Sequence, residues 1–212
     1  MHIPDGFLST NTWVATWVFS AGGLGFCIKK TKEILKDKMV PLMGVMSAFI
    51  FAAQMLNFPV IGGTSGHLLG GVLAAALLGP WAGAIVIACV LAVQCLIFQD
   101  GGLTALGANI FNMSIIGTIG GYFVYRLIAK AVGGDKGVMA GVAIAAWLSV
   151  VIASSACAIE LALSGTSPLQ VALPAMAGVH ALIGIGEAII SCLVIGFVIK
   201  ARPDLVYNYE EE

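Results

Sequence analysis

Charged residues are scarce in this sequence of 212 residues: Asp, Glu, Lys and Arg together make up 10% of it, whereas hydrophobic residues make up 59%. Soluble domains carry about 25% charged residues, so the composition predicts an integral membrane protein that is surrounded by the lipid bilayer. The formal net charge of −1 provides no basic surface for nucleic acid. The length suits one compact bundle rather than two domains.

Motifs of several other protein classes are missing. The five cysteines lie in apolar stretches without a CxxC pair, which predicts hydrophobic side chains inside helices rather than disulfides or a thiolate metal site. The first residues contain no basic region, so they do not predict a secretory signal. No G-x-x-x-x-G-K-[ST] loop occurs, and the chain is therefore expected to be no enzyme and to lack ATP hydrolysis by that route.

Seven apolar stretches predict an all-α bundle of seven transmembrane helices. The third stretch has about 13 residues and covers only about 20 Å, which is too short to cross the hydrocarbon core. Its N-terminal end is therefore expected below the membrane surface, after an irregular segment at residues 60–66 that is either buried in protein or lines a cavity. The predicted spans are residues 10–28, 40–57, 67–79, 80–98, 106–129, 138–163 and 176–200.

All ten Lys and Arg residues fall on one side of the membrane when seven spans are assumed. The positive-inside rule makes that side cytoplasmic. The N-terminus is then outside and the C-terminus inside. We divide the chain into an inserted N-terminal segment at residues 1–9, a membrane domain at residues 10–200 and a short cytoplasmic tail at residues 201–212.

The same topology collects polar side chains, including every histidine, toward the outer half of the bundle, where it places no Lys or Arg. Such a lining attracts a cation, and ionisable groups inside apolar spans are costly and usually functional. These residues are His2, Asp5, His67, Gln99, Asp100, Asn109, Asn112, Glu160, His180 and Glu187.

The first two residues, Met1 and His2, form a chelating sequence. A free α-amine, the amide nitrogen of His2 and its imidazole Nδ1 close a five-membered and a six-membered ring on one metal ion. Metals such as Ni²⁺ and Cu²⁺ favour square-planar nitrogen geometry. His67, at the expected sunken start of the short helix, is the best candidate for the fourth nitrogen. The scheme requires that Met1 keep a free amine.

Five segments carry a family resemblance. Residues 1–8 (MHIPDGFL), 63–71 (GTSGHLLGG), 78–82 (LGPWA), 98–102 (FQDGG) and 107–113 (GANIFNM) resemble the substrate-capture (S) subunit of cobalt/nickel energy-coupling factor (ECF) transporters, the CbiM/NikM family. The resemblance runs from residue 1 to about residue 200. It implies a seven-helix subunit in the prokaryotic cytoplasmic membrane that binds its metal from outside through Met1, His2 and His67.

The resemblance also implies a transported ion and partner chains. The IPDG start favours the nickel branch, with Ni²⁺ as transported substrate and Co²⁺ as the alternative; no organic cofactor is expected. A transmembrane coupling (T) subunit and cytoplasmic ATPase subunits are the implied partners, and any small accessory membrane subunit is expected as a separate chain. Small residues on one face of the second span, Gly44, Ala48 and Ala52, suit docking of the coupling subunit; packing within the bundle is the alternative.

A ligating histidine donates its other N–H to an oxygen, and the sequence alone does not choose the partner. The candidates are Asp5, Gln99, Asn109, Asn112, Glu160 and Glu187. His180 is a further ligand or a pocket wall, and the pocket wall is favoured because four nitrogens already fill the plane. Two other functions remain as hypotheses. Ser65 in a G-x-S-G pattern, with His180 as general base, suits an intramembrane serine protease; Glu160 and Glu187 suit a proton-coupled permease that works alone.

Overall fold

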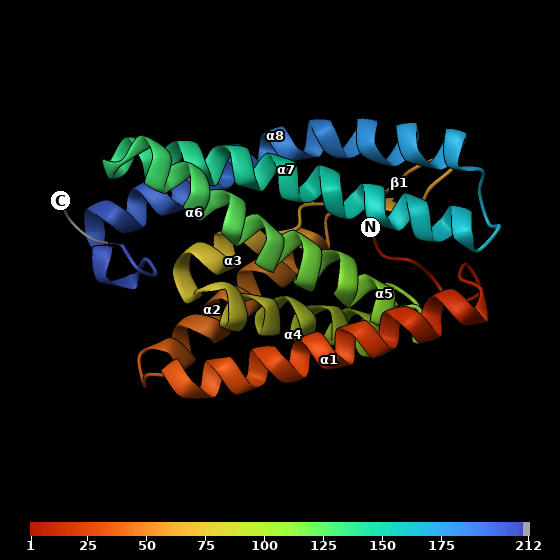
Figure 1. Cartoon of the computed structure of the whole chain (residues 1–212), viewed down its shortest axis with the longest axis horizontal. Coiled ribbons are helices and arrows are strands. Elements are labelled where there is room, and N and C mark those ends of the chain that lie inside the picture. The colour runs from red at the N-terminus through yellow and green to blue at the C-terminus, as the bar shows by residue number, and fades with distance from the viewer. Residues whose placement is uncertain (210–212) are drawn as a thin grey trace.

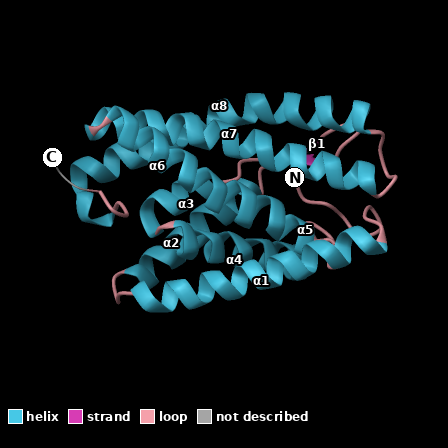
Figure 2. Ribbon diagram, in the orientation of Figure 1, coloured by secondary structure: helices cyan, strands magenta, loops and turns pink. Residues whose placement is uncertain are grey.

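The computed structural model describes residues 1–209. The predicted tail at residues 201–212 is therefore described only in part, and Glu210, Glu211 and Glu212 lie outside the described residues. The described chain is a bundle of helices that run along one long axis (Figures 1 and 2). The N-terminus lies inside the outline of the bundle, whereas the C-terminal part lies at one end (Figure 1).

Helices account for nearly all regular structure. A single two-stranded antiparallel hairpin, β1 with β2, interrupts them in the described residues, and it pairs Phe58 with Gly66 and Pro59 with Ser65. The elements in chain order are α1 (Thr10–Ile34), α2 (Met39–Gln54), β1 (Phe58–Pro59), β2 (Ser65–Gly66), α3 (Gly71–Leu78), α4 (Pro80–Phe98), α5 (Leu106–Ile110), the π-helix η1 (Phe111–Gly120), α6 (Gly121–Val132), α7 (Gly134–Leu163), α8 (Leu169–Ala201) and the 3₁₀ turn η2 (Pro203–Leu205).

Four helical stretches of the described chain are long and apolar enough to cross a membrane. They are α4, the continuous rod of α5, η1 and α6 from Leu106 to Val132, α7 and α8. The apolar α2 has 16 residues and α3 has eight. The helical, apolar character of the prediction is confirmed, but crossing by all seven stretches and the orientation of the termini stay predictions.

The helices differ in their limits from the predicted apolar spans for local reasons. The first helix continues past residue 28 to Ile34, because lysine is a good helix former and extends its charge into solvent. The last helix begins at Leu169 rather than at residue 176 and contains Pro174. The short helix begins only at Gly71, after Gly70 at φ +77°; this left-handed conformation, which suits glycine, ends the preceding loop. His67 therefore lies in a loop, not in a helix.

The short helix α3 forms the centre of the bundle. All eight of its residues are buried, and it packs against α4, η1 and α7. Its C-terminal end meets the last part of the chain, where the Tyr207 N–H donates to the Ala76 carbonyl at 2.8 Å. Its N-terminal end follows the loop that carries His67. This helix thus links the polar region described next with the C-terminal segment.

Candidate metal site

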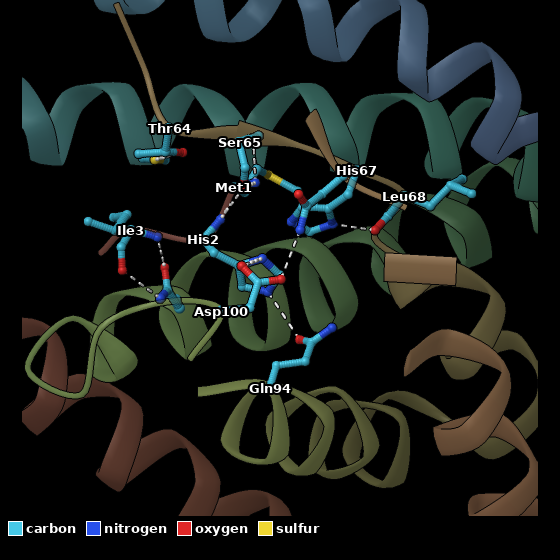
Figure 3. A network of polar contacts seen from close by, with 12 residues as sticks. Met1, His2, Ile3, Thr64, Ser65, His67, Leu68, Gln94 and Asp100 are labelled. Carbon is cyan, nitrogen blue, oxygen red and sulfur yellow. Dashed lines mark hydrogen bonds and ion pairs between the residues drawn. The ribbon is translucent and has the colours of Figure 1, made fainter. Parts of the chain in front are cut away.

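The N-terminal segment threads into the bundle. Met1 and Ile3 are completely buried, and 4% of His2 is exposed. Ile3 is held by a side-chain amide, because its N–H donates to Asn109 Oδ1 at 2.8 Å and its carbonyl accepts from Asn109 Nδ2 at 3.2 Å. The Gly102 N–H donates to the same carbonyl at 2.8 Å. These bonds fix the depth of the segment and the position of the residues before it (Figure 3).

Asp5 fixes the segment where it leaves the bundle. Its carboxylate accepts from the backbone N–H groups of Leu103 at 3.0 Å and Thr104 at 2.8 Å. Hydrogen bonds hold the pKa of Asp5 below its usual value, and the bond from the Thr104 hydroxyl contributes most. The carboxylate therefore stays ionised and keeps accepting these bonds.

Ser65 on β2 receives the chain terminus. The Met1 amine donates to the Ser65 carbonyl and, at 2.9 Å, to its Oγ; the His2 backbone N–H donates to the same Oγ at 3.0 Å. Burial lowers the pKa of the amine to about 5. At neutral pH the amine is therefore uncharged and has a lone pair for a metal ion. Figure 3 shows both nitrogens beside Ser65.

Of the two His2 imidazole nitrogens, Nε2 is hydrogen-bonded and Nδ1 is not. Nε2 lies 3.1 Å from Gln94 Oε1; since that oxygen only accepts, Nε2 carries the proton. Burial lowers the pKa of His2 to about 3, so the ring is neutral and Nδ1 has a lone pair. Nδ1 lies 3.3 Å from Asp100 Oδ1, and it has no hydrogen-bond partner within residues 1–209. Two facing acceptors without a proton between them favour a cation.

His67 presents a second free imidazole nitrogen. Its Nδ1 donates to the carbonyl of Leu68 at 2.6 Å, which leaves the lone pair on Nε2; that atom is buried and has no partner in the described chain. The ring stacks on His2 with centroids 4.4 Å apart and planes 18° apart. The loop thus brings His67 to the two N-terminal residues.

The six oxygen partners expected for the histidines have other surroundings in the structure. Gln99 is exposed, at φ +56° beyond the end of α4. Asp5 and Asn109 bind the N-terminal backbone instead, and Glu187 binds the amides of Leu69 and Gly70. None of the six candidates has a hydrogen bond to a His2 or His67 ring nitrogen within residues 1–209. The last two candidates, Asn112 and Glu160, bond to each other at 2.6 Å.

The actual partners of the two rings are Gln94 and the Leu68 carbonyl. Gln94 is a lone amide in the apolar α4 and is completely buried. A buried amide requires a hydrogen-bond partner, and that was the signal available in the sequence. The backbone carbonyl of Leu68 has no such signal, because every residue has one.

The protease hypothesis is not supported. Ser65 Oγ accepts hydrogen bonds from the Met1 amine and the His2 N–H. His180 Nδ1 donates to the Met176 carbonyl at 2.7 Å. Within the described residues no hydrogen bond joins Ser65 to His180. The nucleophile and base of a serine hydrolase need such contact.

The small residues of α2 face away from the bundle. Gly44, Ala48 and Ala52 are exposed, and a Cβ built on Gly44 would meet no atom within 4 Å. Packing of this face within the described chain, the alternative considered above, is therefore wrong. The face is open to lipid or to another protein.

Solved structures and sequence relatives show the class of the protein. A crystal structure described as a truncated transition metal transporter superimposes with a TM-score of 0.89 at 38% identity, covering 95% of this chain and 99% of that one. A second transition metal transporter structure gives 0.88, also at 38% identity, over 95% and 93%. These similarities define a membrane transport protein for transition-metal ions, not an enzyme.

The family follows from the sequence comparison. The family model described as cobalt uptake substrate-specific transmembrane region, CbiM, matches residues 2–205, and the chain belongs to this family. It is 43% identical to a putative fused nickel transport protein NikMN of Archaeoglobus fulgidus, over 97% of this chain and 68% of that protein. It is 32% identical to a putative cobalt transport protein CbiM of Methanocaldococcus jannaschii, over 97% and 90%. The chain is a cobalt/nickel transport component of a membrane.

Proposed function

We propose that this chain is the substrate-capture subunit of an ECF-type transporter and binds Ni²⁺ from outside the cell. The supporting observation is the convergence of four buried nitrogens: the Met1 amine, the His2 amide, His2 Nδ1 and His67 Nε2. Three have lone pairs free at neutral pH. The fourth, the His2 amide, donates to Ser65 Oγ at 3.0 Å and has to release its proton to bind, as strongly polarising metals promote.

Chelation explains why the terminal residues are buried. The amine and amide close a five-membered ring, and the amide and Nδ1 a six-membered ring, so three nitrogens lie nearly in one plane. His67 Nε2 supplies the fourth position. A square-planar nitrogen site suits Ni²⁺ and Cu²⁺ better than Zn²⁺ or Mg²⁺. The metal is the substrate, and no organic cofactor takes part.

Nickel is favoured over cobalt by the identities of the named relatives, 43% for the nickel protein and 32% for the cobalt protein. The site itself does not exclude Co²⁺, because ligand sets of this kind bind several divalent metals in the Irving–Williams order. Cobalt capture by the same four nitrogens is therefore the second candidate. Competition between the two ions for the purified protein decides between them.

Transport requires other chains in this proposal. The exposed face at Gly44, Ala48 and Ala52 allows close approach of a helix from the coupling subunit. Cytoplasmic ATPase subunits supply the energy, and a small accessory membrane subunit is a further expected partner. The subunit lies in a prokaryotic cytoplasmic membrane with its N-terminus outside.

Nickel loading of purified protein tests the site. Native protein is expected to hold one Ni²⁺ with the d–d absorption and diamagnetism of a square-planar complex. His2→Ala and His67→Ala are expected to lose this spectrum. His180→Gln is the matched control, because it changes the third buried histidine, whose Nδ1 is bound to Met176, and should keep it. Retention of the native spectrum by His67→Ala contradicts the proposed ligand set.

Nickel uptake into vesicles tests whether this chain needs ATPase subunits for transport. If this chain alone, without ATPase subunits, accumulates nickel against a gradient, the permease hypothesis replaces the ECF proposal. The ECF proposal predicts binding without accumulation.

A further inference from the structure

The loop that carries His67 is anchored at Leu69, whose N–H and carbonyl are both hydrogen-bonded to side chains of other elements. The Leu69 and Gly70 N–H groups donate to Glu187 Oε2 at 2.7 Å and Oε1 at 2.6 Å. The Leu69 carbonyl accepts from Gln54 Nε2 at 2.7 Å. Glu187 belongs to α8 and Gln54 to α2, so two helices distant in sequence hold the same residue.

The anchoring groups are buried. Glu187 is 1% exposed, and Gln54 and Leu69 are 0% exposed. A buried carboxylate is costly unless it accepts hydrogen bonds, and Glu187 receives one on each oxygen. It also lies at the N-terminal end of α3, where the helix dipole favours a negative charge. The cost of burying an acid here is thus offset by contacts that all go to the metal-site loop.

One peptide unit joins Glu187 to the His67 ring. The Leu69 N–H and the Leu68 C=O belong to the same planar peptide. Its N–H donates to Glu187, and its C=O accepts from His67 Nδ1 at 2.6 Å. Because the peptide is rigid, the hydrogen bond from its N–H to Glu187 also fixes its carbonyl, and the carbonyl in turn orients the His67 ring. Hydrogen bonds in such a chain also polarise one another, so the carboxylate makes the carbonyl a stronger acceptor and His67 Nε2 a stronger donor to metal.

We propose that Glu187 is a positioning residue of the metal site, which acts on His67 through the Leu68–Leu69 peptide. A carboxylate bound directly to a ligating histidine orients the ring and raises its basicity, and losing it weakens metal binding. Here the same effect passes through one backbone amide. The inference rests on the proposed role of His67 as a ligand.

The variant Glu187→Gln tests this role. It keeps the size of the side chain but removes the charge and replaces one acceptor oxygen by an NH₂ group, so one loop N–H loses its partner. Glu160→Gln is the matched control, because Glu160 is also a buried carboxylate of the bundle but bonds to Asn112 and not to the loop. Both variants are loaded with Ni²⁺, and the d–d spectrum and the rate of nickel loss to a chelator are measured.

The expected result is a d–d band at lower energy and nickel release about 10- to 100-fold faster in Glu187→Gln, the range for loss of such outer contacts. Glu160→Gln should match the native protein in both measurements. Native spectrum and release rate in Glu187→Gln overturn the inference. Equal changes in both variants also overturn it, because they would reflect only the loss of a buried acid.

Two further measurements keep the test decisive. If Glu187→Gln does not fold, Glu187→Asp retains the charge with a shorter reach, and nickel release faster than in the native protein is expected; a native rate overturns the inference. His67→Ala separates this inference from the proposed site. Loss of the spectrum in His67→Ala with native behaviour in Glu187→Gln refutes only the role of Glu187, whereas a native spectrum in His67→Ala refutes the site itself.

Discussion

Adding one alanine before Met1 is the sharpest perturbation of the proposed site. A start of Met-Ala-Met allows the initiator methionine to be removed before the small alanine, which leaves Ala joined to Met1. The Met1 amine then becomes an amide and loses its basic lone pair. Because Met1 is completely buried, the added residue also has to find about 3.8 Å of chain length inside the bundle. Displacement of the segment is expected.

The magnitude follows from the contacts of the amine. It donates to the carbonyl and to Oγ of Ser65. These bonds hold the N-terminal segment in its buried position before metal binds. At about 1 kcal/mol for each hydrogen bond, their loss shifts the equilibrium between the buried and displaced segment by about 2 kcal/mol, or about 30-fold, and the apparent metal affinity falls with the population of the buried position. Loss of the nitrogen–metal bond and of the five-membered ring adds to this value. The extended protein should therefore bind Ni²⁺ at least about 30-fold more weakly and lack the square-planar spectrum.

Titration with Ni²⁺ in detergent, read by metal content and d–d absorption, measures the effect. The control carries one alanine inserted between Lys36 and Asp37, which are exposed in the loop between α1 and α2. It has the same added mass without touching the site and should bind as the native chain does. Equal nickel affinity of the native and extended proteins refutes the amine as a ligand. The site would then have to be rebuilt around His67 and the buried carboxylates.

Three further substitutions test the packing around the site and the docking face. Gly102→Ala places a Cβ 2.6 Å from the Pro4 carbonyl carbon; it should push the N-terminal segment out and abolish nickel binding, and normal binding would contradict the described position of that segment. Gly79 has φ +83°, and Gly79→Ala places a Cβ 2.8 Å from the Tyr207 ring. The substitution should lower the free energy of unfolding by at least about 1 kcal/mol, and an unchanged Tm would contradict this contact. Ala48→Trp on the exposed face of α2 should leave nickel binding unchanged but prevent co-purification with the coupling subunit; intact assembly would place docking elsewhere.

The structure places Gln94, not the predicted Gln99, beside His2, and the reason lies in the geometry of α4. Gln94 and Gln99 are five residues apart, so in a regular helix they point in directions about 140° apart. Only Gln94 faces the histidines. Gln99 lies past the helix end, where its positive φ turns the chain away. Which of two amides meets His2 depends on how α4 is rotated against a segment 92 residues earlier, and a local pattern does not contain that rotation.

Some properties of this protein were determined by the sequence alone. The low charge and the apolar stretches predicted a helical membrane protein, because hydrocarbon excludes charge and requires internal hydrogen bonding of the backbone. The family resemblance is confirmed by the match over residues 2–205. The residue types of Met1, His2 and His67 predicted metal-binding chemistry, which stays a prediction. These features are local, since each depends on composition or on a few adjacent residues.

Only the tertiary structure decided which nitrogen of each ring is free and what holds it. The Gln94 contact leaves Nδ1 free on His2, and the Leu68 carbonyl leaves Nε2 free on His67. The link from Glu187 to the loop spans 118 residues and ends on backbone amides. Backbone groups are the same in every residue, so no sequence pattern marks them. Their partners become defined only when packing brings α8 and the loop together.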